Sequence, residues 1–163
     1  MATKERQFWA VVDLTEQELM LALTVANMRH IASRRRGLKN AHGFDGRGEF
    51  EVDALGAQAE MALAKWTRTY WSASVDTFHG ADLGDRVQVR ATTYRDGHLL
   101  IRQCDPIDHT YVLVVRLSPF QFRIAGQIEG REARRAEFLS QPDQSRVPVW
   151  AVPQSALHPV GRR

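Results

Sequence analysis

Four polar side chains in the middle of the chain suit the handling of a phosphate group and a hard cation. Glu60 and Asp82 supply carboxylates, while Gln88 and Arg90 supply an amide and a guanidinium group. Mg²⁺ commonly binds one or two carboxylates together with waters and phosphate oxygens. Such an ion lowers the pKa of its bound water and stabilises charge on the phosphate, and an arginine can add to that stabilisation. Whether these groups act together depends on the elements that carry them.

The strand that carries Gln88 and Arg90 has the clearest pattern in the chain. Residues 86–92 alternate between apolar and polar side chains, which is typical of a half-buried strand. Because side chains two residues apart share a face of a strand, Gln88 and Arg90 point the same way. Asp82 lies six residues before Gln88. A hairpin or bulge through residues 83–85 would return Asp82 to the side of the strand.

Glu60 lies on a helix that we predict from about residues 52–53 to Arg68. The buried face of this helix consists of Leu55, Ala59, Ala62, Leu63 and Trp66. At about 100° per residue, Glu60 falls at the margin of this apolar face and not opposite it. Gly56 and Ala64 lie one turn before and after it and are small. They leave room for the carboxylate of Glu60 to reach the sheet.

Each of these residues also has an ordinary structural explanation. Glu60 would be a solvated carboxylate on a helix surface, and Asp82 a turn residue between two glycines. Gln88 and Arg90 would form the polar face of a half-exposed strand. The order of all four residues along the chain is what favours a site.

This order resembles that of the PD-(D/E)XK nuclease superfamily, in which a helical Glu and then an Asp precede an acid-x-Lys strand. The resemblance is carried by Gly56–Glu60, Asp82, Gln88–Arg90 and the Gly126–Gly130 stretch. These motifs look like those of small phage-encoded proteins of this type, and the resemblance covers roughly Val52 to Leu139. It implies a restriction-endonuclease-like αβββαβ core over about residues 52–152, with an added N-terminal helical extension over about residues 13–37.

The activity that the resemblance implies is metal-dependent hydrolysis of phosphodiester bonds, in DNA rather than RNA, by an endonuclease or exonuclease. Asp82 and Glu60 would hold Mg²⁺ or Mn²⁺ with help from the Val89 carbonyl. Gln88 would align the site, and Arg90 would replace the family's Lys.

Two of these residues depart from the family's pattern. Gln88 offers a neutral oxygen where the family usually has an acid, which weakens metal binding. Arg90 stays protonated near neutral pH and cannot serve as a general base. The alternative is a catalytically inactive nuclease-like module that binds nucleic acid or a host protein.

A further helix is predicted before the candidate site. Thr15 and Glu18 have the spacing of a capping box, so this helix begins at about residue 16. It ends around Arg36, because Gly37 is a natural residue after a helix end. Its apolar stripe near the 3.6-residue period consists of Leu19, Leu23, Ala26, His30 and Ile31.

Basic and aromatic side chains supply candidates for contacts with nucleic acid. The basic candidates are Arg34, Arg35, Arg36 and Lys39, and later Arg131, Arg134 and Arg135. They would grip phosphates. The first three would alternatively only oppose the dipole at the helix end. The aromatic candidates are Trp66, Tyr70 and Trp71, which would stack on bases or anchor the helix end in the core.

The remaining pattern predicts a sheet and one more helix. Expected strands are 98–102 after a turn at Asp96-Gly97, 111–117, the alternating segment around Phe120, Phe122 and Ile124, and 149–152. Residues 111–117 are almost continuously apolar, as in a strand covered on both faces. Residues 129–139 read as a short basic helix. We therefore expect an α/β fold, with α+β as the alternative, and a mixed central sheet.

Composition limits the remaining classes of protein. The 163 residues, 44% of them hydrophobic and 25% charged, fit a single folded domain. No apolar run approaches the roughly 20 residues of a membrane span. Cys104 is the only cysteine, which fits a reducing cytoplasm (the host's, if the protein is phage-encoded). The net charge of +3 permits a nucleic-acid partner. A homodimer is compatible with everything above.

Overall fold

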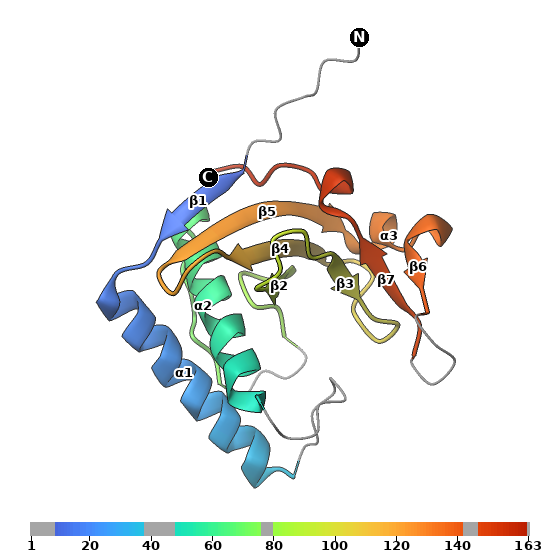
Figure 1. The fold of residues 1–163 in the computed structure, drawn as a ribbon. Coiled ribbons are helices and arrows are strands. Elements are labelled where there is room, and N and C mark those ends of the chain that lie inside the picture. Colours follow the sequence, from blue (N-terminus) through green and yellow to red (C-terminus); the bar gives the residue numbers. More distant parts are fainter. Residues whose placement is uncertain (1–8, 38–47, 76–79, 142–146, 163) are drawn as a thin grey trace.

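Two β-sheets and three α-helices make up the part of the chain that the computed structural model describes, residues 9–37, 48–75, 80–141 and 147–162 (Figure 1). The helices are α1 (Glu16–Arg35), α2 (Glu49–Thr67) and α3 (Gly130–Ala133), and two short 3₁₀ helices are η1 (Ala136–Phe138) and η2 (Gln154–Ala156). The strands are β1 (Ala10–Asp13), β2 (Val87–Thr92), β3 (Leu99–Ile101), β4 (Thr110–Arg116), β5 (Gln121–Glu129), β6 (Leu139–Ser140) and β7 (Val149–Val152).

The central sheet is mixed, as predicted. Its strand order is β1-β5-β4-β2, in which β2 and β4 are parallel and the other neighbours are antiparallel. The second sheet, β3-β7-β6, is antiparallel throughout. Because β3 joins this second sheet, β2 is the outer strand of the central sheet among the described residues, and no other described strand pairs along its outer edge.

Helix α2 covers one face of the central sheet, and α1 lies on the outer side of α2 (Figure 1). Every residue of α2 from Ala57 to Ala64 is buried. The side chains of Val112 and Val114 on β4 point into the core that α2 closes, together with Phe122 and Ile124 of β5. This packing fixes α2, and with it Glu60, against the sheet.

The opposite face of β4 is covered as well. Tyr111, Leu113 and Val115 alternate with the valines above and pack in a second core with Leu99 and Ile101 of β3. The prediction of a strand covered on both faces is therefore confirmed for residues 111–115. The pairing of β4 with β5 shifts by one residue at a bulge in β5, because Leu113 lies opposite Gly126 whereas Val114 lies opposite Ile124.

Helix α1 starts as predicted but faces the core with a different set of residues. The Thr15 side chain accepts a hydrogen bond from the Glu18 N–H, and the Glu18 carboxylate accepts one from the Thr15 N–H. Gly37, at a φ of 62°, follows the helix end. The buried residues are Ala22, Val25 and Ala26. Of the predicted stripe, Leu23 and Ile31 are instead exposed, because α2 contacts α1 one helical position away from them.

Three further expectations need correction. Helix α2 begins at Glu49, earlier than predicted, directly after Gly48 with its positive φ of 81°. Residues 129–139 do not form one helix. Strand β5 runs to Glu129 because Ile128 pairs with Tyr111 in the second core, so only α3 and η1 remain helical. Strands β1 and β6 were not predicted, since each is a short edge strand.

Among the described residues, no helix combines the length and apolarity needed to cross a membrane.

Candidate functional site

A tight turn returns Asp82 to the outer edge of β2, as the sequence predicted. Leu83 forms an antiparallel bridge with Val87, and Gly84 between them has a φ of 56°, which favours glycine. The N–H of Asp82 donates to the Val87 carbonyl at 2.9 Å. The chain therefore folds back along the edge of β2 and carries the side chain of Asp82 toward Val89.

The carboxylate of Asp82 takes the place of a neighbouring strand. Its Oδ2 accepts a hydrogen bond from the N–H of Val89 at 2.7 Å. The N–H and carbonyl of one strand residue point to the same side, so the Val89 carbonyl also faces the outer edge. Within the described residues, Oδ2 is the oxygen of Asp82 that accepts a hydrogen bond.

Glu60 is buried, with 5% of its surface exposed, and both of its oxygens are engaged. Arg29 of α1 donates to Oε1 at 2.7 Å and to Oε2 at 2.8 Å, which is a bidentate ion pair. The indole N–H of Trp71 donates to Oε2 at 2.9 Å. The view of Glu60 as a solvated surface carboxylate is therefore excluded.

Arg29 is held in place from two sides. Its Nε donates to the carbonyl of Ser74 at 2.8 Å, so the segment after α2 fixes the guanidinium group over Glu60. Burial lowers the pKa of Arg29, but the hydrogen bonds and charge of Glu60 outweigh burial and raise it. Arg29 is therefore a permanent positive charge inside the site.

The two carboxylates lie close enough to influence each other. Burial raises the pKa of Asp82 from 3.8 to about 6, and the negative charge of Glu60 contributes to the rise. The Val89 N–H and the guanidinium groups of Arg90 and Arg29 act in the opposite direction. A carboxyl group so perturbed beside a second acid is a common feature of functional sites.

Gln88 and Arg90 share one face of β2, as predicted, and each contacts the loop before β4. Gln88 is buried, and its Nε2 donates to the Gly80 carbonyl at 3.1 Å and lies 3.3 Å from Nδ1 of His109. Arg90 pairs with Asp105 at 2.9 Å. The guanidinium of Arg90 also lies within 3.4 Å of the Val89 carbonyl, next to the edge that Asp82 occupies.

The structure places the four predicted residues on two sides of β2. Val87 and Val89 pack against the core that α2 closes. Gln88 and Arg90 therefore point to the opposite face of the sheet, where the Arg90 guanidinium lies over the ring of Tyr111.

Glu60 and Asp82 are coupled through their charges, and Arg90 contributes to the same field. The hydrogen bonds of Gln88 go to Gly80 and His109 instead.

A divalent cation at this site would need several ligand atoms close together. Within the described residues, no group of three or more His, Cys, Asp or Glu side chains could hold a metal ion. Asp82 and the Val89 carbonyl supply oxygens at the same edge of β2, but the carbonyl also accepts a hydrogen bond from Arg90 at 3.4 Å. A hard cation there would need waters and phosphate for its other ligands and a shift of Arg90. Glu60 fits as a further ligand only if Arg29 releases it, because Arg29 donates to both of its oxygens.

The basic candidates differ in their surroundings. Arg34, Arg35 and Arg36 are exposed at the end of α1, and Lys39 lies outside the described residues. Arg131 and Arg135 are also exposed. Arg134 instead donates to the carbonyls of Gly130, Arg102 and Asp105, and its guanidinium lies over the ring of Trp150. The guanidinium group of Arg134 is therefore engaged in contacts within the protein.

The aromatic candidates also differ from one another. Trp66 and Trp71 pack against the core that α2 closes, and Trp66 donates to the Val160 carbonyl at 3.2 Å. These two contacts confirm the anchoring role for both tryptophans. Tyr70, with 84% of its surface exposed, is the aromatic candidate that is open to solvent.

The partners of Glu60 were not predicted from the sequence. Arg29 is not among the predicted site residues, and Trp71 was predicted only to stack on bases or to anchor the helix end. A signal was present, since Ala22, Ala26 and Arg29 recur at helical spacing on the buried face of α1. An arginine on a face of small buried residues requires a buried acid opposite it.

Comparison of the chain with models of protein families, with curated proteins and with solved structures gives no match.

Proposed function

We propose that this protein is a metal-dependent nuclease that hydrolyses phosphodiester bonds, with DNA as its substrate. The observation that carries the proposal is the position of Asp82 beside Val89 at the edge of β2, where burial and the nearby charge of Glu60 raise the pKa of Asp82. Of the two carboxylates, the half-buried Asp82 is the one that an extended phosphate backbone could approach. The proposal rests on one part of the core that the sequence resembles, the order of helix α2, returning turn and strand β2. A phage-encoded protein acting in the host cytoplasm fits this proposal.

Each residue has a defined task in the proposed site. A bound Mg²⁺ or Mn²⁺ would supply an activated water and charge stabilisation on the phosphate. Asp82 and the Val89 carbonyl would hold the cation, and Glu60 would join them when Arg29 moves to a substrate phosphate. Arg29 and Arg90 stabilise negative charge on the scissile phosphate. Gln88, fixed by Gly80 and His109, keeps the strand edge in position.

Exposed arginines can hold the substrate outside this centre. Arg34, Arg35 and Arg36 extend from the same helix as Arg29, with Arg131 and Arg135 on a second surface. Their contribution is electrostatic and independent of base sequence. Binding through them weakens as the salt concentration rises.

A second function is favoured by a separate observation. Both oxygens of Glu60 are engaged by Arg29 and Trp71, and Gln88 supplies no negative charge. A site with its own permanent cation has less need of a metal ion. The second candidate is therefore a catalytically inactive module that binds nucleic acid, or a host protein, through the same surface.

Cleavage assays separate the two candidates. Supercoiled plasmid and single-stranded DNA are incubated with the protein and Mg²⁺ or Mn²⁺, with a chelator as control. We expect cleavage that is lost on chelation and lost in Asp82→Asn, which keeps an acceptor for the Val89 N–H. Asp85→Asn is the matched control, because Asp85 is an exposed acid in the same turn. Salt-sensitive DNA binding without cleavage would favour the inactive module, and activity that survives chelation would refute the metal-dependent nuclease.

A further inference from the structure

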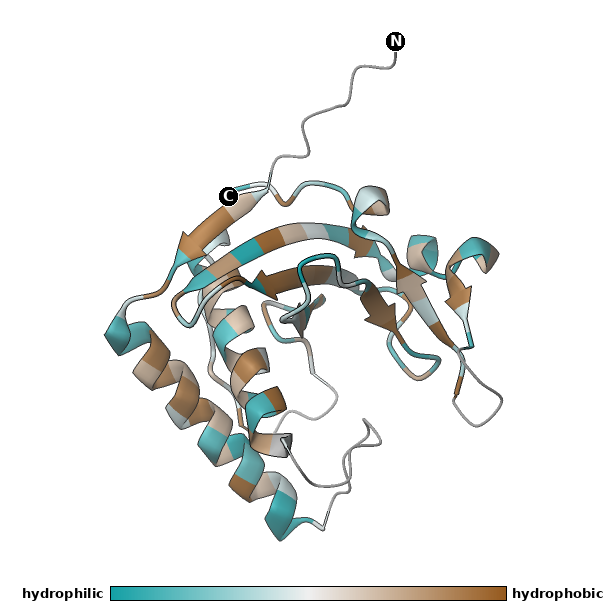
Figure 2. Cartoon of the chain, in the orientation of Figure 1, coloured by the Kyte–Doolittle hydropathy of each residue, from teal (hydrophilic) through white to brown (hydrophobic). Residues whose placement is uncertain are grey.

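The outer side of α1 exposes an unusual amount of apolar surface. The exposed fractions are 70% for Met20, 50% for Leu21, 39% for Leu23 and 51% for both Met28 and Ile31. Figure 2 shows hydrophobic segments along α1, which lies at the outside of the molecule with α2 behind it. Single exposed apolar residues are ordinary, but a contiguous apolar patch marks an interaction surface.

The exposed positions have the spacing of a coiled-coil seam. Steps of three and four residues connect Gln17, Met20, Thr24, Asn27, Ile31 and Arg34, all of them exposed. This alternation produces a straight stripe that a second helix can cover. Leu21 and Met28 flank the stripe on one side, and Leu23 flanks it on the other.

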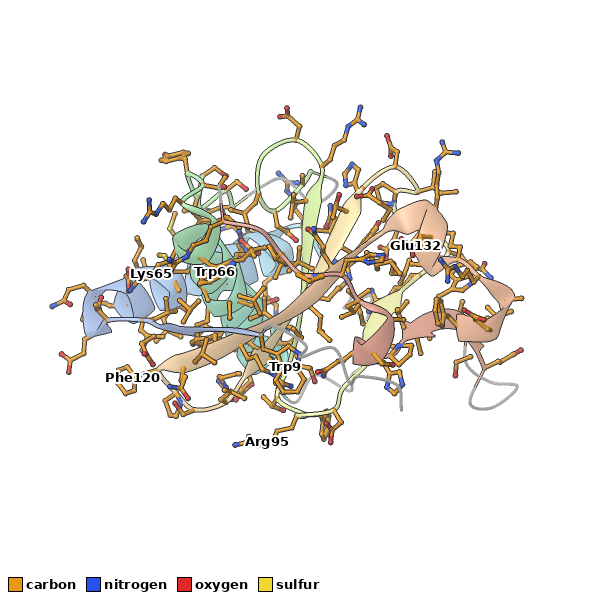
Figure 3. All side chains as sticks on the ribbon, turned by 90° about the horizontal axis from the view of Figure 1, so that it is seen from above. Trp9, Lys65, Trp66, Arg95, Phe120 and Glu132 are labelled. Atoms are coloured by element: carbon orange, nitrogen blue, oxygen red, sulfur yellow. The ribbon has the colours of Figure 1, made fainter. Side chains whose placement is uncertain are left out.

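A groove beside the seam extends the apolar surface. It is lined by Leu19, Met20 and Leu23 of α1 and by Phe50 and Phe120 from other elements. Phe120 lies at the turn between β4 and β5, beside the N-terminal end of α1 (Figure 3). The apolar surface is therefore wider than the helix itself.

The seam is complementary to itself when the direction of the helix is reversed. In an antiparallel pair centred between Thr24 and Asn27, these two residues lie opposite each other, and Met20 lies opposite Ile31. The charges also match, since the first turn is acidic and the last turn is basic. A parallel pair would instead place each charged end against its own copy. The charge pattern therefore favours the antiparallel direction for a pair of these helices.

We propose that the outer face of α1 is the interface between two copies of this chain, which pair antiparallel around a twofold axis. A twofold interface uses the same surface on both partners, as this seam allows. The helix is about 30 Å long, which gives the pairing room for five turns of contact. The inference does not rest on the proposed nuclease activity, but it assigns Arg34 to the interface between copies and not to the substrate.

Sedimentation equilibrium of the full chain measures the assembly. We expect a concentration-dependent mass that rises from 18.5 kDa toward twice that value. Met20→Glu and Ile31→Glu should each return the protein to the monomer with an unchanged circular dichroism spectrum. Val147→Glu is the matched control, because Val147 is 71% exposed outside α1 and should leave the dimer intact.

Disulfide trapping in a Cys104→Ser background tests the direction of pairing. Thr24→Cys places the two thiols about 4.5 Å apart along the axis, whereas Ile31→Cys separates them by about 16 Å. We expect rapid cross-linking of the first variant and none of the second. A monomer at all concentrations, a dimer that survives Met20→Glu and Ile31→Glu, or efficient cross-linking through Ile31→Cys would each overturn the proposal.

Discussion

The two carboxylates of the candidate site lie in opposite electrostatic situations. Glu60 is neutralised by a bidentate arginine and receives a third hydrogen bond from Trp71. Asp82 receives one backbone hydrogen bond, lies at the outer edge of β2 and has its pKa raised to about 6. The negative charge of Glu60 is balanced by Arg29 within the fold. The ionised form of Asp82 would be stabilised by a further cation. The difference gives Glu60 a structural role in the fold and makes Asp82 the carboxylate that the proposed function assigns to a ligand.

The largest effect is expected from removing the counter-ion of Glu60. Arg29→Leu leaves a buried carboxylate without its partner, which should lower the free energy of unfolding by about 3–5 kcal/mol. Adding Glu60→Met should recover most of that loss, because the unpaired charge is then gone. Urea denaturation of the two variants measures both values. If Arg29→Leu alone were as stable as the wild type, the ion pair between Arg29 and Glu60 would not be formed.

A smaller effect is expected from the third hydrogen bond of Glu60. Trp71→Phe keeps an aromatic ring in the core but removes the indole donor. Since the acceptor is charged, the loss should be about 1.5–3 kcal/mol of unfolding free energy. In the Glu60→Met background the same substitution should cost clearly less. Equal costs in both backgrounds would contradict a hydrogen bond to Glu60.

The raised pKa of Asp82 predicts how stability depends on pH in a metal-free buffer. Between pH 4 and 6 the folded state holds a proton on Asp82 that the unfolded state has lost. Stability should therefore fall as the pH rises through this window, by roughly 1–3 kcal/mol, and then level off. Asp82→Asn should remove this component of the pH dependence. A component that persists in Asp82→Asn would assign the titration to another group.

The smallest effects are expected at exposed arginines. Arg135 is 53% exposed in its side chain and pairs with Glu132 at 2.8 Å. Arg135→Ala should change the free energy of unfolding by less than about 1 kcal/mol, because solvent screens such a pair. The same substitution should reduce the salt dependence of DNA binding slightly. A loss of several kcal/mol would show that the ion pair belongs to the core.

Much of the fold could be predicted from local patterns. The capping box at Thr15 fixed the start of α1, and the alternation at residues 86–92 gave β2. The apolar run of β4 indicated cover on both faces, and the turn that returns Asp82 followed from its glycine. Each of these signals lies within a few residues of the feature that it predicts.

What could not be predicted depends on contacts between distant segments. Arg29 and Glu60 are 31 residues apart, and no local rule pairs them. The parallel pairing of β2 with β4, and the transfer of β3 to a second sheet, likewise follow from the packing of two cores. The sequence did not show which apolar residues of α1 are exposed, because the exposed and the buried ones recur with the same helical period.

The most direct test of the contrast between the two carboxylates is a calorimetric titration of Mn²⁺ at neutral pH. The wild-type protein should bind one equivalent, Asp82→Asn should bind none, and the matched variant Asp85→Asn should bind like the wild type. If Mn²⁺ did not bind to the wild-type protein, or bound equally to Asp82→Asn, the proposed role of Asp82 as a ligand of the cation would be contradicted.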